Sequence, residues 1–119
     1  MSTYPITVLL VSWNLTDTWL KRFQVFLTEF KKVDPVDKAR AVERFREYNY
    51  DIVVLDENCL IGDYPLIKQF TEIQPATRVI VIADSPDWRK ARQAFQSGAV
   101  EYVPTSIDGD EMKKILQEV

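Results

Sequence analysis

An aspartate ends one of the most apolar stretches of the sequence. Asp56 closes the run Ile-Val-Val-Leu over residues 52–55. Such a run predicts a strand buried on both faces, as at the centre of a parallel sheet. Ligands and reacting groups in open α/β sheets collect at the carboxyl ends of the strands. Asp56 is therefore the first candidate for chemistry, and what it can do depends on the side chains around it.

Three further strand ends are expected to meet Asp56 at the same edge of the sheet. They are residues 12–14 (Ser-Trp-Asn), 83–85 (Ala-Asp-Ser) and 104–106 (Pro-Thr-Ser). The chain has no histidine, which excludes histidine-based triads and histidine metal sites. Its three glycines are isolated, so no glycine-rich phosphate loop supports nucleotide or flavin binding. Cys59 lacks a histidine to activate it, and we predict a buried apolar role for it.

The elements that would position these residues follow a strand–helix order repeated five times. Strands are predicted over residues 6–12, 31–34, 51–56, 78–83 and 99–103, and the first helix over 16–28. The second strand is short, because Pro35 is expected to end it at an edge position. This order predicts a parallel sheet with right-handed crossovers and helices on both faces. At this length we expect a flavodoxin-like, three-layer α/β/α fold with strand order 2-1-3-4-5.

Several residues mark where the helices begin and end. Thr16 or Asp17 is expected to cap the first helix, and Asp37 the second. Ser85 is expected to cap the fourth helix, with proline in its first position. Gly98 is placed to end that helix in a left-handed conformation. Residues 57–64, after the central strand, are predicted to form a loop.

The bulk composition narrows the class of protein. With 119 residues, the chain is long enough for one domain with a real core, although a domain cut from a longer protein would look the same. The net charge of −3 argues against nucleic acid as a direct partner. No apolar run approaches the roughly 20 residues that span a bilayer, and residues 1–5 lack the basic start of a signal peptide. Together with a single cysteine, this predicts a cytoplasmic protein that does not enter membranes.

Over essentially its whole length the chain resembles the receiver domain of bacterial response regulators, the CheY-like family. Residues 6–12, 51–56 and 79–83 match the first, third and fourth strands. Residues 98–103, Gly-Ala-Val-Glu-Tyr-Val, match the Gly-Ala-x-x-Tyr lead-in to the fifth strand. The resemblance implies that Asp56 stands at the position that accepts a phosphoryl group from a histidine kinase.

The positions that support phosphorylation in that family depart from its pattern here. In the family, two acids at the end of the first strand hold Mg²⁺, and this chain has Val11, Ser12 and Trp13 there. The hydroxyl residue that ends the fourth strand is replaced by Ala83, and the lysine that ends the fifth is replaced by Thr105. Tyr102 matches the family's aromatic switch position, although a packed ring with its hydroxyl in water is an equal alternative. Trp13 either fills the place of the ion or is a loop residue that covers the core.

Phosphoryl transfer depends on a divalent cation and fixed positive charge. We therefore expect an atypical receiver, or pseudo-receiver, that is not an enzyme and holds no metal or cofactor. It would signal through a protein partner: a kinase, an output domain or a second copy. The alternative is a receiver still phosphorylated at Asp56, with Asn14 or Asp84 supplying oxygen ligands for Mg²⁺. Small-molecule sensing at the altered strand ends is a third possibility, without a specific motif.

The resemblance also implies a partner surface on the fourth helix, fifth strand and fifth helix. Exposed aromatic and arginine side chains are typical interface anchors. The candidates are Trp88, Arg92, Glu101, Tyr102 and Lys113. Trp88 lies in phase with Ala91 and Phe95, a pattern that more often indicates a core position.

Overall fold

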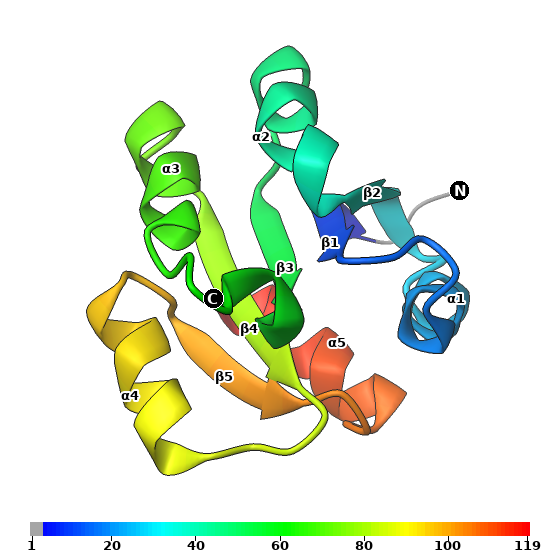
Figure 1. Cartoon of the computed structure of the whole chain (residues 1–119). Coiled ribbons are helices and arrows are strands. Elements are labelled where there is room, and N and C mark those ends of the chain that lie inside the picture. Colours follow the sequence, from blue (N-terminus) through cyan, green and yellow to red (C-terminus); the bar gives the residue numbers. More distant parts are fainter. Residues whose placement is uncertain (1–3) are drawn as a thin grey trace.

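The computed structural model describes residues 4–119 and has five parallel strands in the order β2-β1-β3-β4-β5 (Figure 1). The strands are β1 (Tyr4–Ser12), β2 (Phe30–Asp37), β3 (Ile52–Asp56), β4 (Arg78–Ala83) and β5 (Glu101–Pro104). The helices are α1 (Thr18–Phe26), α2 (Lys38–Glu47), the 3₁₀ helix η1 (Glu57–Leu60), α3 (Leu66–Ile73), α4 (Trp88–Gln96) and α5 (Gly109–Glu118). This confirms the predicted flavodoxin-like, CheY-like fold and its strand order.

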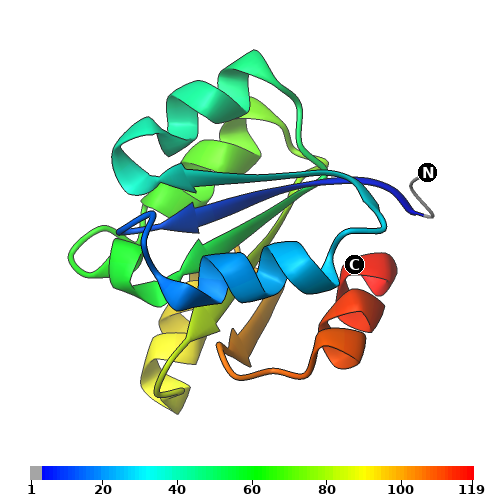
Figure 2. The ribbon, with the colours of Figure 1, turned by 90° about the vertical axis from the view of Figure 1, so that its right-hand side faces the viewer.

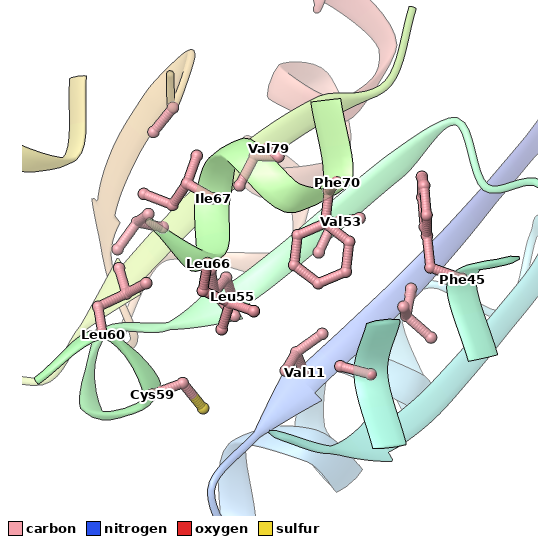
Figure 3. Packing of buried hydrophobic residues seen from close by; sticks show 14 of the residues in the cluster. Val11, Phe45, Val53, Leu55, Cys59, Leu60, Leu66, Ile67, Phe70 and Val79 are labelled. Atoms are coloured by element: carbon pink, nitrogen blue, oxygen red, sulfur yellow. The ribbon is translucent and has the colours of Figure 1, made fainter. Parts of the chain in front are cut away.

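Helices cover both faces of the sheet, because successive strand residues point to opposite sides. Leu9 and Val53 belong to the apolar cluster beneath α2 and α3, whereas Val8 and Val54 belong to the cluster beneath α1 and α5. Figure 3 shows α3 side chains, among them Phe70, packed over the central strands. Figure 2 shows all the strand arrows pointing to the side opposite the two chain ends. The carboxyl ends of the strands therefore share one edge.

The second strand is longer than predicted. It continues through Pro35 to Asp37, and Pro35 pairs with Leu10 in the register of β1. An edge strand has a partner on one side alone, so it tolerates a residue without an N–H group. Val36, beyond the proline, is buried in the core beneath α2. The prediction that Pro35 ends the strand was therefore wrong.

The other boundaries shift by smaller amounts. The first helix covers Thr18–Phe26 rather than 16–28, and β5 covers Glu101–Pro104 rather than 99–103. Residues of the predicted loop after β3 form the 3₁₀ helix η1. The central strand begins at Ile52 and ends at Asp56, as its apolar run indicated.

The helix caps follow the sequence in part. Asp37 caps α2, since its carboxylate accepts a hydrogen bond from Arg40 N at 3.0 Å. Gly98 has a φ of 115° and is left-handed, as predicted. The cap of α4 is Asp87 rather than Ser85, because the Asp87 carboxylate accepts from Arg89 N at 2.7 Å. None of the helices within residues 4–119 is long and apolar enough to cross a membrane.

Candidate functional site

The predicted strand ends do meet at one edge of the sheet, which we call the mouth (Ser12, Asp56, Ala83 and Thr105). Asp56 pairs in register with Ile82 of β4, and Ala83 pairs with Pro104 of β5. Thr105 N donates to Ala83 O at 2.9 Å and ties the loop after β5 to the end of β4. The mouth is therefore an ordered surface built by the parallel strands.

Asp56 is 5 % exposed at the centre of the mouth. Its Oδ1 accepts a hydrogen bond from Asn58 N at 3.0 Å, which begins η1. Burial raises the pKa of the Asp56 carboxyl, while the hydrogen bond from the Asn58 N–H opposes that shift. The negative charges of Asp84 and Asp17 raise the pKa further. The carboxylate is thus held among like charges, in a place where its charged form is disfavoured.

Asp17 is a member of this site that sequence reasoning missed. It stands at the cap position of α1, but its Oδ2 accepts a 2.5 Å hydrogen bond from the buried Ser12 Oγ. In the described chain its side chain makes no capping bond to α1. The signal in the sequence was an aspartate five residues beyond a strand that ends on serine. Because aspartate is a common helix cap, the sequence did not indicate that this side chain points toward β1 instead.

Trp13 does not have one of the two roles expected of it, that of covering the core. Its side chain is 65 % exposed, and Lys38 Nζ lies 5.6 Å from the ring centroid. The ring lines a groove of about 670 Å³ with residues that include Val42 of α2 and Leu66 of α3. A ring that is mostly exposed does not cover the core.

A cation lies beside Thr105, at the end of β5. Arg22 of α1 donates from Nη1 to Thr105 O at 2.5 Å and from Nη2 to Ile107 O. Arg22, Thr105 and Ser106 line a cavity of about 530 Å³, together with Trp19 and others. The guanidinium is therefore committed to backbone carbonyls of the loop after β5.

A Mg²⁺ ion prefers an octahedral set of oxygen ligands, and the candidate ligands at the mouth are Asp56, Asn14 and Asp84. Among residues 4–119, no group of three or more cysteine, aspartate or glutamate side chains is arranged to hold a metal. The Asn14 amide oxygen already accepts hydrogen bonds from Thr16 N and Thr16 Oγ1, at 3.0 and 2.9 Å. Asp84, the other ligand considered from the sequence, is exposed at the start of the loop after β4.

Tyr102 makes contacts that the sequence did not suggest. Its hydroxyl donates to Glu57 Oε2 and accepts from Asp87 N at 3.4 Å. Burial, and after it the bond to Glu57, raises the pKa of Tyr102 to about 12. Lys90 Nζ lies 3.6 Å from Glu57 Oε1. Glu57 therefore joins β5 and α4 immediately beside Asp56.

The candidates for a partner surface do not all share one environment. Trp88 is 68 % exposed and Phe95 is 47 % exposed, so the core position favoured for Trp88 was wrong. The apolar side of α4 carrying them, with the exposed Arg92 four residues after Trp88, faces outward. Glu101 is half-buried, and Lys113 lies 3.8 Å from Glu29. Trp88 and Arg92 share one helix face, whereas Lys113 lies on α5, beside α1.

Comparisons with known proteins agree with the architecture. No protein-family model and no curated protein sequence matches the chain. A response regulator from Thermotoga maritima is 21 % identical, with 97 % of this chain and 99 % of that chain covered, at a TM-score of 0.80. A response regulator protein from Burkholderia pseudomallei, solved with a phosphorylated aspartic acid, a calcium ion and citrate, is 17 % identical; 95 % of this chain and 67 % of that chain are covered, at a TM-score of 0.80. The beryllofluoride-activated NtrC4 receiver domain dimer is 21 % identical, with 93 % of both chains covered, at a TM-score of 0.80. At such identities the likeness is one of fold.

Proposed function

We propose that this chain is an atypical receiver domain that signals through protein contacts in the cytoplasm, without Mg²⁺-dependent phosphorylation of Asp56. The observation that carries the proposal is the setting of Asp56. It occupies the end of the central strand in a receiver fold, but it is nearly buried and lies among the charges of Asp17 and Asp84. In place of a metal-binding acid pair, the adjoining strand offers Ser12, whose hydroxyl is bonded to Asp17.

The energetics oppose a phosphoryl group at this position. An aspartyl phosphate would bring nearly two negative charges close to Asp17 and Asp84. Phosphoryl transfer is catalysed largely by positioning and by positive charge that stabilises the developing anion. Arg22 is a cation beside the mouth, and two of its nitrogens already bond backbone carbonyls. Lys90, on α4, is paired with Glu57. The same chain therefore keeps the phosphoacceptor carboxylate and lacks the charge balance for its use.

A surface on α4 supports a function in protein binding. We call Trp88, Arg92 and Phe95 the α4 stripe; their spacing places them on one side of the helix. Residues 88–97 contain three basic and no acidic side chains, in a chain whose net charge is −3. Tryptophan and arginine dominate the energetics of many interfaces. A protein partner with an apolar pocket and acidic side chains is the chemistry that complements this stripe.

The test is a titration with Mg²⁺ and beryllofluoride, an analogue of the phosphoryl group, monitored by tryptophan fluorescence. Trp19, beside Asp56, is the reporter, and Trp13→Phe and Trp88→Phe substitutions remove the two exposed emitters. We expect no saturable change in emission. In a second assay, the chain is incubated with a small phosphodonor and its mass is measured by mass spectrometry. The Burkholderia protein, which was solved with a phosphorylated aspartic acid, is the positive control of that assay. A saturable response that disappears in Asp56→Asn would instead establish a working phosphoacceptor.

A further inference from the structure

One carboxylate collects contacts from two separate elements beside the mouth. The Glu57 side chain is 12 % exposed and is the first residue of η1, directly after Asp56. One of its oxygens accepts the Tyr102 hydroxyl of β5, and the other lies 3.6 Å from Lys90 Nζ of α4. Hydrogen bonds and ion pairs to a charged group with little access to water are stronger than those at the open surface.

The same contacts reach the first turn of α4 by a second route. The Tyr102 hydroxyl accepts a hydrogen bond from the backbone N–H of Asp87, at 3.4 Å. Asp87 is the residue that caps α4. The start of α4 is thus connected to Glu57 both through Tyr102 and through Lys90. Figure 1 shows α4 alongside β5 at one side of the molecule.

Apolar burial contributes little to holding α4 in place. Of its nine residues, which the structure describes in full, Ala94 alone is buried. In comparison, α3 buries Leu66, Ile67 and Phe70 over a shorter length. Segments with few buried apolar contacts open locally at low free energy. The polar contacts at the first turn of α4 therefore have a large share in fixing its position.

We propose that Glu57 is an internal carboxylate that holds α4, and with it the α4 stripe, in one orientation without any phosphoryl group at Asp56. The inference rests on the proposed function in that the α4 stripe is the partner surface. It explains how such a chain can signal although the residues around Asp56 depart from the phosphorylation pattern of the family. The anion that organises α4 is part of the polypeptide, so the surface is presented constantly and its output depends on the amount of partner.

The experiment is amide hydrogen exchange on the full chain, comparing Glu57→Ala and Glu57→Gln with the wild type. The matched control is Glu72→Ala, which removes an exposed glutamate from α3. We expect the amides of α4 to exchange about tenfold faster in Glu57→Ala, the ratio that corresponds to 1.4 kcal/mol, and less so in Glu57→Gln. The amides of β3 should keep the wild-type rate. The pKa of Tyr102, followed by ultraviolet absorbance, should fall from about 12 in both Glu57 variants.

Two further variants decide the result if Glu57→Ala unfolds or exchanges faster throughout. Lys90→Gln and Tyr102→Phe each remove one contact to Glu57, and each should speed exchange in α4 without affecting β3. Unchanged exchange of α4 in these variants, or in Glu57→Ala, overturns the inference. A saturable beryllofluoride response of the wild type would instead overturn the proposed function. The link between Glu57 and α4 would then still be decided by the exchange measurements.

Discussion

The hydroxyl of Ser12 donates to the carboxylate of Asp17 across 2.5 Å, and this bond directs a helix-cap residue away from its own helix. The contact joins the end of β1 to the start of α1. It also brings a second acidic side chain, besides Asp84, close enough to Asp56 for its charge to raise the pKa of that carboxyl. The altered chemistry of the mouth thus involves a residue beyond the strand ends themselves.

Replacement of Ser12 by alanine should lower the free energy of unfolding by about 1–3 kcal/mol. The hydroxyl bonds a charged acceptor, and its removal leaves the partly buried Asp17 carboxylate without that donor. Urea unfolding monitored by circular dichroism measures the change. Ser106→Ala, which removes an exposed hydroxyl, is the control and should stay within about 0.5 kcal/mol of the wild type. Equal effects of the two substitutions would show that the Ser12–Asp17 bond contributes nothing.

Asp56→Asn should stabilise the protein at neutral pH. The folded-state pKa of Asp56 is raised above its ordinary value near 3.8, so the folded protein binds the proton more tightly than the unfolded chain does. The contribution of Asp56 protonation to wild-type stability is therefore fully present below the unfolded pKa and is lost as the pH rises through the folded pKa. Asparagine resembles the protonated acid at every pH, and its amide oxygen can still accept from Asn58 N.

Urea unfolding of this variant and the wild type from pH 3.5 to 7 tests the prediction. The gain in free energy of unfolding should be near zero at the acidic end and should reach a plateau above the folded pKa. Glu72→Gln, at an exposed position, should show no such rise. A loss of stability at pH 7 in Asp56→Asn would mean that the carboxylate is favourably paired, contrary to its surroundings in the structure.

The Cys59 thiol should resist alkylation and disulfide reagents in the native protein. It is fully buried, and burial, with a further contribution from the charge of Asp56, raises its pKa to about 12. Relative to an ordinary thiol of pKa 9.0, its thiolate fraction at neutral pH is about a thousandfold lower. Ellman's reagent should react slowly in buffer and at once in 6 M urea. Prompt reaction without denaturant would contradict the burial.

Trp88→Ala should leave stability within about 0.5 kcal/mol of the wild type, because the ring is mostly exposed. Phe70→Ala removes a fully buried ring of α3 and should lower the free energy of unfolding by about 3–5 kcal/mol. Thermal unfolding of both variants provides the comparison. A large loss of stability in Trp88→Ala would return that ring to the core and remove it from the α4 stripe.

The sequence was most informative where burial decides the structure. The run that ends at Asp56 is apolar on both faces of its strand, and this alone fixed the central strand and its productive end. The length of the edge strand was underestimated, because a proline such as Pro35 indicates the end of a strand when the strand pairing is unknown. The sequence also did not predict the direction of side chains. The pattern that identifies α4 as amphipathic does not determine whether Trp88 packs against another element or faces water.

The candidate site shows the same limits. Strand order predicted that Ser12, Asp56 and Thr105 would converge, since carboxyl ends of parallel strands share an edge. Local rules could not predict that Asp17 turns to Ser12, because the choice between a helix N–H and a hydroxyl depends on the packing of two elements. Nor could they find the contact of Glu57 with Tyr102, which are 45 residues apart in the sequence.

The two outermost strands of the sheet, β2 and β5, both contain a proline, at Pro35 and Pro104. Each proline removes a backbone donor from a strand that borders solvent, and such edges are poor templates for the pairing of another strand. Extension of this sheet from one molecule into the next is therefore disfavoured at both borders. Two proline residues thus protect both borders of the sheet from aggregation, and the partner surface proposed above lies on a helix instead of on a sheet edge.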